Sequence, residues 1–490
     1  MAATTSFPGV ALSAAESVET VLAAIAEHNG EVNAFCRVFP QEARARAAEL
    51  DALPRALPLA GRTFSVKDAM AQQGVPCTVG SRALAESVPA YTVSPVERLE
   101  AAGAIAIGRT NVPEFCYRGT SKNDLYGATG NPWDPTRSAG GSSGGAACAV
   151  ALGLGEIALG SDGGGSIRIP ASFCGVVGFK ATYGIVPHVS DSAGWLTLTH
   201  VGPLTRTVGE CALALSVIAG PDARDPLSAP VLPRDYVAAA RPGDLRGLRV
   251  AVTPDLGYIR TDDGVREAFE RAVERFATLG CTIEHADPGL ASPLDTWNTI
   301  ACGDNLVSEG DLLKSGLVGD DTRALIEAGA EVTAREYVAA RNDMWLYAKR
   351  WTQFMSRYDL VLMPAMECVA FPLDQWSPRE IGGVAVGEFY DDYCHFSYPF
   401  NLTGMPAISV PMGTAEHDLP IGLQIVGRRY EDELVLRAAA AWEAIAPWSF
   451  PTRTPQPGSR PRAGAIVEGR RVLCASSPRG DEWVVETTTA

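Results

Sequence analysis

The sequence predicts an α/β protein in which a β-sheet is flanked by helices. Short apolar stretches with the pattern of buried strands recur along the chain and alternate with segments of helical periodicity. At 490 residues the chain is long enough to bury a sizeable core, and its 46% hydrophobic and 20% charged content is typical of a globular protein. These values exclude a disordered or fibrous chain.

The first half of the chain contains helical and strand patterns in turn. A helix at the start is predicted by a capping box, in which Ser13 and Glu16 enclose the first turn, and by the apolar residues that follow at helical spacing. Strands are predicted by short runs of alternating or continuous apolar residues. Helices are expected at 13–28, where Asn29-Gly30 is expected to stop the first one, at about 40–51 and at 144–155. Strands are expected at 61–66, 104–108 and 157–160, and loops over 111–141.

The second half continues the alternation and adds a helical segment. Apolar residues from Val265 to Phe276 form one face of a helix, and Gly280 is expected to close it. The apolar stripe at 337–355 favours core packing, although its tryptophan and methionine residues would also suit an acyl or aryl pocket. The other expected elements are a strand at 248–252, a helical cap over about 295–357, strands at 407–411 and 421–426, and a last helix capped by Asp432.

We expect one large domain over 1–450 and a C-terminal extension over 451–490. Beyond Pro451 the composition shifts to Pro, Arg, Gly and Thr, which is typical of a loosely attached, flexible tail. Two strand-like stretches within 464–485 would suit a hairpin.

The net charge and the cysteines restrict the partners and the compartment. A formal net charge of −16 would repel a phosphate backbone, so no direct contact with nucleic acid is expected. The 11 cysteines are scattered and form no Cys-x-x-Cys pair, which indicates reduced thiols and no zinc site. No signal peptide or membrane span is recognisable. We therefore expect a cytoplasmic protein without a metal.

The densest chemical signal lies between residues 138 and 184. Two glycine-rich stretches that carry serine flank a close-packing helix and a short buried strand, so the fold can bring both stretches to one edge of a sheet. Such loops let backbone N–H groups point together, which suits an oxyanion as well as a phosphate. A phosphate site is disfavoured because neither glycine run fits a nucleotide-binding pattern.

A serine nucleophile needs a base, and the residues themselves leave two kinds of base open. None of the six histidines lies in either glycine loop, although sequence distance alone does not exclude a Ser-His-Asp triad. A desolvated lysine can also act as a base near neutral pH, and Lys67 follows an apolar strand.

Five further blocks accompany the segment 138–184. They are LAGRTFSVKD (59–68), GRTNVPEFCY (108–117), YGATGNPWDPTRSAGGSSGG (126–145), YPFNLTGMPAISVPMG (398–413) and LPIGLQIVGR (419–428). Together these blocks resemble the amidase signature family of serine hydrolases over about 13–450. The resemblance implies the amidase signature fold, an α/β/α sandwich with a central mixed β-sheet. One departure is Arg62-Thr63, where the family commonly has a valine-proline pair.

The resemblance also implies a serine–serine–lysine proton relay, an oxyanion-binding loop and a supporting ion pair. The matching residues are Ser166 as the acylated nucleophile, Ser142 as the bridging serine after a cis peptide, Lys67 as the terminal base, Gly163, Gly164, Gly165 and Ser166 as the residues of the loop that offer backbone N–H groups, and Asp162 with Arg168 in the pair. In such a relay the proton passes from nucleophile to bridge to lysine and returns to the leaving nitrogen.

We therefore expect an amidase that hydrolyses a carboxylic amide to an acid and an amine without a metal or organic cofactor. Anilides, carbamates, lactams and esters are alternative substrates. The competing function is that of a glutaminase-type amidotransferase subunit, which supplies ammonia to a partner acting on misacylated tRNA. At the level of the family, a homodimer is the expected assembly.

Overall fold

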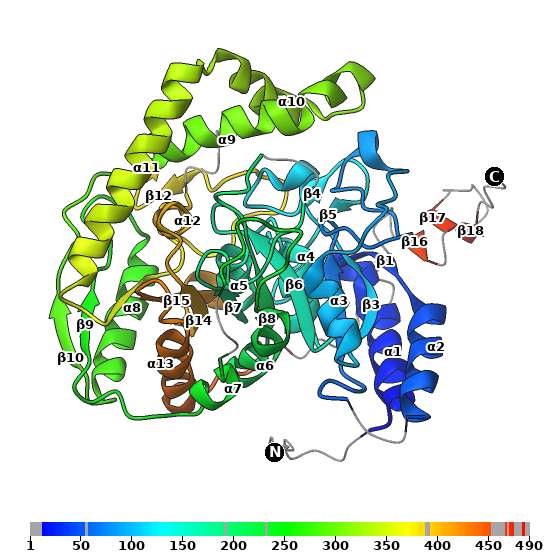
Figure 1. The fold of residues 1–490 in the computed structure, drawn as a ribbon, viewed down its shortest axis with the longest axis horizontal. Coiled ribbons are helices and arrows are strands. Elements are labelled where there is room, and N and C mark those ends of the chain that lie inside the picture. Colours follow the sequence, from blue (N-terminus) through cyan, green and yellow to red (C-terminus); the bar gives the residue numbers. More distant parts are fainter. Residues whose placement is uncertain are drawn as a thin grey trace.

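A large mixed β-sheet forms the centre of the molecule (Figure 1). The computed structural model describes residues 12–53, 57–190, 194–230, 234–387 and 393–451, together with the backbone of three short strands between 466 and 485. The 14 strands lie in the order β10 (Thr282–His285), β9 (Arg249–Val252), β11 (Leu360–Pro364), β15 (Pro420–Gly427), β14 (Ala407–Thr414), β7 (Val177–Lys180), β8 (His200–Thr205), β6 (Ile157–Asp162), β2 (Thr63–Lys67), β3 (Ile105–Thr110), β1 (Phe35–Val38), β16 (Ile466–Val467), β17 (Arg470–Cys474) and β18 (Trp483–Val485).

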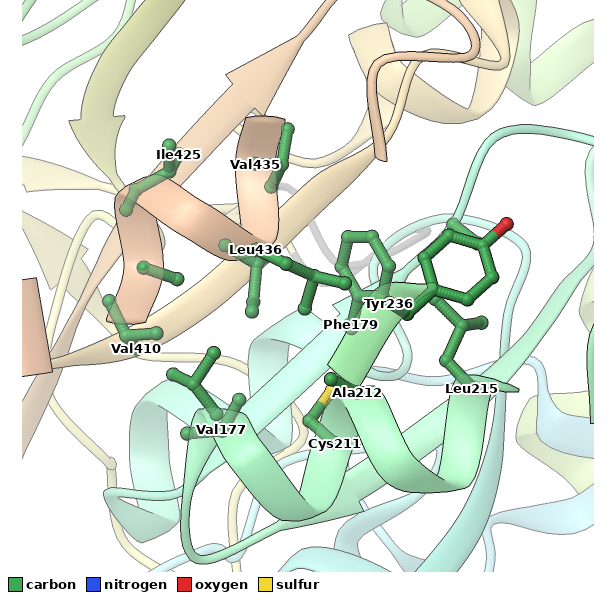
Figure 2. Packing of buried hydrophobic residues seen from close by; sticks show 14 of the residues in the cluster. Val177, Phe179, Cys211, Ala212, Leu215, Tyr236, Val410, Ile425, Val435 and Leu436 are labelled. Atoms are coloured by element: carbon green, nitrogen blue, oxygen red, sulfur yellow. The ribbon is translucent and has the colours of Figure 1, made fainter. Parts of the chain in front are cut away.

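Helices pack against this sheet in separate apolar clusters, which confirms the α/β/α sandwich. One cluster joins the sheet to α3 (Ser94–Ala101), α6 (Val208–Ile218), α7 (Tyr236–Ala239), α8 (Asp263–Ala277) and α13 (Asp432–Ile445). Figure 2 shows part of it, where Leu215 on α6 and Leu436 on α13 lie close to Phe179 on β7. A second cluster joins the sheet to α1 (Ala14–Val32), α2 (Pro40–Asp51), α4 (Gly144–Ala151) and α5 (Arg168–Cys174).

The expected helical cap consists of α9 (Leu294–Glu309), α10 (Asp320–Glu327) and α11 (Ala334–Met355), which lie together beyond one side of the sheet (Figure 1). The apolar stripe of α11 is core, as expected: Trp351 and Met355 are fully buried in a third cluster, with α9, β11 and α12 (Tyr398–Thr403). Among the described helices, none combines the length and the apolar composition needed to cross a bilayer.

The capping box at Ser13 is confirmed, but the expected stop at Asn29-Gly30 is wrong. Helix α1 continues to Val32, and Asn33, in the left-handed region at φ 54°, forms its C-cap. Asn29 is buried, and its side-chain amide exchanges two hydrogen bonds with the backbone of Phe35, at 2.7 and 3.0 Å. This tertiary contact outweighs the local preference of Asn-Gly for a turn.

Two other helix ends also differ from expectation. Helix α8 ends at Ala277, and Gly280, at φ 86°, lies in the turn that follows rather than closing the helix. Asp432 is the first residue of α13 and does not cap it. Its carboxylate accepts hydrogen bonds from the N–H and the hydroxyl of Thr182, both at 2.7 Å, and so joins the helix to the segment after β7.

The extension after Pro451 adds three strands to the edge of the sheet. β16 pairs with β1 in parallel through two residue pairs, β17 pairs with β16, and β18 pairs with β17 in antiparallel fashion. The backbone of 466–485 therefore contains the expected antiparallel pairing. The expected linker at 452–463 lies outside the described residues.

We expect a chain that ends at residue 455 to fold and to remain active. Truncation removes only the two residue pairs between β1 and β16. It retains Trp448, whose ring lies 5.5 Å from that of Trp133, and Phe450, whose ring lies 4.7 Å from the Arg206 guanidinium. Thermal unfolding and amide hydrolysis of the truncated chain measure this. An insoluble or inactive product would show that the extension belongs to the fold.

Candidate active site

The glycine loop and the predicted base follow neighbouring parallel strands. β2 ends on Lys67 and β6 ends on Asp162, and the two strands pair in parallel with Val66 opposite Leu159. Their carboxyl ends therefore meet at one edge of the sheet, where ligands bind in many α/β proteins. The segment that leads into α4 reaches the same edge, so Ser142 lies beside Lys67 although 75 residues separate them.

The departure from the family pattern at Arg62-Thr63 leaves this edge unchanged. Thr63 is the first residue of β2, and the Arg62 guanidinium donates to the Glu156 carboxylate at 2.7 Å. Both residues lie at the opposite end of β2 from Lys67, which therefore keeps its place at the end of the strand.

Lys67 is fully buried and has close oxygen partners on two serines. Its Nζ lies 2.7 Å from Ser142 Oγ, 2.9 Å from Ser161 Oγ and 3.3 Å from the Ser161 carbonyl oxygen. A neutral amine has two N–H groups and one lone pair. It can therefore donate to both Ser161 oxygens while it accepts a hydrogen bond from the Ser142 hydroxyl. Ser161 was not predicted, although it directly precedes Asp162 and the glycine run.

Burial lowers the pKa of Lys67 from its ordinary value, because removal from water penalises the ammonium form. The Cys116 thiol and the Asp162 carboxylate act in the opposite direction, but the net shift is downward. At a given pH more of Lys67 is therefore neutral than of a lysine in water. Only the neutral form accepts a proton, so this environment suits a base.

The two predicted serines, Ser142 and Ser166, line one cavity. The peptide bond between Gly141 and Ser142 is cis, as the resemblance implies. Glycine is required at 141, because a Cβ there would lie 2.5 Å from the carbonyl carbon of Thr120. The Ser143 N–H donates to the Ser166 carbonyl oxygen at 3.1 Å, which ties the two serine-bearing loops together.

Two tryptophans pack directly on the glycine loop. A Cβ on Gly163 would lie 2.9 Å from the Trp195 ring, and a Cβ on Gly164 would lie 2.6 Å from the Trp297 ring. The Trp297 indole N–H also donates to the Gly163 carbonyl oxygen at 3.0 Å. Side chains at these two positions would displace the tryptophans, so the loop contacts them through backbone alone.

Gly165 does not match the expectation that its N–H is offered to an oxyanion. That N–H donates to the Asp162 carboxylate at 2.7 Å and so holds the loop in shape. The N–H groups of Gly163, Gly164 and Ser166 are left as the candidate donors of the loop.

The expected ion pair between Asp162 and Arg168 is present and fully buried. Arg168 donates from Nε and Nη2 to the two carboxylate oxygens, each at 2.9 Å, and also donates to Asn401 at 2.7 Å and to Gln424 at 2.9 Å. Burial alone would raise the pKa of Asp162, but the charge and hydrogen bonds of Arg168 hold it well below its usual range. The carboxylate therefore stays ionised at the start of the glycine loop.

The cavity above the serines has a volume of about 260 Å³ and an aromatic wall. Helix α11 contributes no lining residue among the described ones, so the alternative interpretation of its tryptophan and methionine residues as a pocket wall is wrong. The aromatic lining residues are Phe115, Tyr117, Trp195, Trp297 and Tyr398, and Cys116 and Glu309 line the cavity beside them.

The cap positions part of this wall. The Trp195 backbone N–H donates to the Asp304 carboxylate at 2.9 Å, and its indole N–H donates to the Asn305 side-chain oxygen at 2.8 Å, both on α9. Sequence reasoning missed Trp195, Trp297 and Glu309, because no local spacing marks them. Trp297 and Glu309 reach the cavity through the docking of α9, and Trp195 is hydrogen-bonded to the same helix.

Among the described residues, one histidine lines the cavity, without a hydrogen bond to either serine. His188 lines the cavity, and burial lowers its pKa from the ordinary value. In the ranges that the structure describes, no histidine ring hydrogen-bonds to Ser142 or Ser166. Within the same ranges, no group of three His, Cys, Asp or Glu side chains is arranged to hold a metal ion.

Comparisons with known proteins identify the family of the chain. A family model described as amidase matches residues 16–436. An acylamidase of Rhodococcus erythropolis is 39% identical over 450 residues, which is 89% of this chain and 93% of that protein. The A subunit of the glutamyl-tRNA(Gln) amidotransferase of Chloroflexus aurantiacus is 35% identical over 467 residues, covering 89% of this chain and 94% of that protein.

Solved structures give the same result. The structure of a bacterial aryl acylamidase of the amidase signature enzymes superposes with a TM-score of 0.84 and 31% identity, over 89% of this chain and 94% of that one. A 6-aminohexanoate cyclic dimer hydrolase superposes with a TM-score of 0.80 and 30% identity, over the same shares. The chain therefore belongs to the amidase family, the amidase signature enzymes, and is an enzyme that acts on amide C–N bonds.

Proposed function

We propose that this enzyme hydrolyses a carboxylic amide through an acyl-enzyme on Ser166. Ser166 Oγ attacks the carbonyl carbon while its proton passes to Ser142, and the Ser142 proton passes to neutral Lys67. The relay then returns a proton to the nitrogen as the C–N bond breaks, and the amine leaves. Water, activated by the same relay, hydrolyses the ester and releases the acid.

The glycine loop stabilises the negative charge that develops on the carbonyl oxygen. The N–H groups of Gly163, Gly164 and Ser166 donate to it, in a loop held by the buried Asp162–Arg168 pair. Neither a metal nor an organic cofactor is needed for these steps.

The contact that carries the proposal is the 2.7 Å approach of Lys67 Nζ to Ser142 Oγ. A lysine on the surface would be protonated and solvated, whereas this one is buried and its pKa is lowered. A buried lysine that faces a serine within a glycine-rich loop has a direct chemical use as the final proton acceptor.

The aromatic wall supports substrates with an apolar acyl or aryl part, such as anilides, over glutamine. The competing function, a glutaminase that supplies ammonia to a partner acting on misacylated tRNA, draws its support from the 35% identity to the amidotransferase of Chloroflexus aurantiacus. Glutamine carries a free carboxylate and only a short chain, and these groups gain little from a wall of rings.

We expect the purified chain alone to hydrolyse anilides and other carboxylic amides and to leave glutamine intact. Mass spectrometry of a panel of amides, anilides, carbamates, lactams, esters and glutamine measures this. Ammonia from glutamine, released only when an amidotransferase partner protein is added, would instead favour the competing function.

We also propose a cytoplasmic location, a small-molecule amide as the partner and no contact with nucleic acid. The cysteines of the described residues are all free thiols, which suits a reducing compartment. A homodimer and the division into 1–450 and 451–490 remain proposals, which light scattering and the truncated chain test.

A further inference from the structure

The wall of the cavity is a continuous row of aromatic rings from separate parts of the chain. Tyr117 and Trp195 stack with ring centroids 6.0 Å apart, Trp195 and Trp297 meet edge to face at 5.5 Å, and Trp297 and Tyr398 lie 4.6 Å apart. All of these rings line the cavity that holds the two serines. Their faces carry partial negative charge, which attracts cations as well as apolar groups.

A carboxyl group stands at the end of this row. Glu309, the last residue of α9, lines the same cavity, and its Oε2 accepts a hydrogen bond from the Tyr117 hydroxyl. Within the described residues this is its one hydrogen bond, so Oε1 has no protein donor. The side chain is part-buried and keeps an acceptor for a molecule that enters the cavity.

The charge on Glu309 depends on pH in the neutral range. Burial raises its pKa to about 7, the Tyr117 hydroxyl acts against this shift, and the Asp304 carboxylate adds to it. A bound cation would compensate both the burial and the repulsion from Asp304.

The other titratable groups near Glu309 do not neutralise it. Asp304 is already held by the hydroxyl of Tyr337 on α11, at 2.8 Å. Arg118 directs its guanidinium over the Trp376 ring, 5.5 Å from the centroid. Burial favours the neutral form of His188.

We propose that Glu309 and the aromatic row select amides that carry a positively charged amine group. The ammonium ion would donate to Glu309 Oε1 and lie against the faces of the rings, which combines a charge-assisted hydrogen bond with cation–π attraction. This inference rests on the proposed function, because it names the substrates of the same site.

The test uses pairs of substrates that differ in charge and not in shape. 5-Aminopentanoyl anilide is compared with hexanoyl anilide, and 4-(aminomethyl)acetanilide with 4-ethylacetanilide, so that the ammonium enters on either side of the amide. For one of the two pairs we expect the wild type to prefer the ammonium in kcat/KM by roughly 10- to 100-fold, which is typical of a charge-assisted hydrogen bond. The preference should lie mainly in KM, because the contact is remote from the bond that breaks.

Glu309→Gln should reduce this preference to near unity, since it keeps the shape and removes the charge. Asp295→Asn, which removes an exposed negative charge from the first turn of the same helix, should keep the preference. The preference of the wild type should grow from pH 6 to pH 8, because the carboxylate forms as the pH rises through about 7. In Glu309→Gln it should stay flat over that range.

A binding measurement separates this inference from the proposed function. Calorimetry should detect tighter binding of the phenethylammonium ion than of 2-phenylethanol to the wild type, and equal binding of both to Glu309→Gln. Ammonium binding without hydrolysis of any amide would refute the proposed function alone. Equal wild-type kinetics for both members of each pair, or a preference that survives in Glu309→Gln, would overturn the selection of cations.

Discussion

Ser166→Ala should lower amide hydrolysis by about 10⁴-fold or more and abolish covalent labelling by a fluorophosphonate. Loss of the nucleophile removes the acyl-enzyme route and leaves only what binding and the oxyanion donors contribute. The fold should be retained, because the substitution removes one oxygen and the loop is held by the Asp162 carboxylate and not by this side chain. Intact-mass analysis and steady-state kinetics measure the two effects.

Ser308→Ala is the matched control, since Ser308 lines the same cavity but lies on the cap helix α9. It should take up one equivalent of the probe, as the wild type does. Labelling of Ser166→Ala at one site and at the wild-type rate would show that another side chain is the nucleophile.

Lys67→Ala should lower amide hydrolysis by about 10²- to 10⁴-fold, the range expected for general acid–base catalysis, and should affect a matched ester much less. An amine leaves poorly unless it is protonated as the C–N bond breaks, whereas a phenoxide needs little help. Without the lysine, hydroxide becomes the base, so the residual activity should rise with pH. Rates for an anilide and the corresponding phenyl ester between pH 6 and 10 measure both effects.

His188→Ala provides the comparison, because His188 lines the same cavity and is the histidine that a Ser-His mechanism would use there. We expect this variant to keep the wild-type ratio of amide to ester rates. Circular dichroism of both variants should match the wild type. Equal losses for amide and ester in Lys67→Ala, with an unchanged pH profile, would mean that the lysine only positions the substrate.

The sequence was sufficient to place the sheet edge and the residues around Lys67. The strand patterns at 61–66 and 157–160 overlap β2 and β6. Parallel pairing of these two strands brings Lys67 and the glycine loop together. The roles of the glycine, serine and lysine residues came from the resemblance to the amidase signature family, because the residue types alone left both a histidine and a lysine open as the base. Lys67 and the glycine loop are positioned by strands that are readable from their apolar patterns.

Side-chain hydrogen bonds and helix packing account for what the sequence did not predict. The Gly165 N–H was expected to face the cavity, but the neighbouring carboxylate of Asp162 takes it. The stop at Asn29-Gly30 failed because Asn29 bonds to Phe35 in the following strand. The same holds for Glu309, which reaches the cavity only because α9 docks against the glycine loop. Local periodicity contains no information about which side chain accepts a given N–H group or about how a helix docks.

The attachment of Trp195 to the cap has a consequence for the evolution of this enzyme. The groups proposed to move protons belong to β2, β6 and the loops beside them, whereas the aromatic wall of the cavity is shaped largely by α9 and the tryptophan that it anchors. Mutations in the cap can therefore alter the substrate range of the enzyme and leave its catalytic groups unchanged. A combinatorial library confined to Trp195, Trp297, Glu309 and Tyr398 would change the wall of the cavity, and with it the substrates accepted, without changing the proposed proton relay.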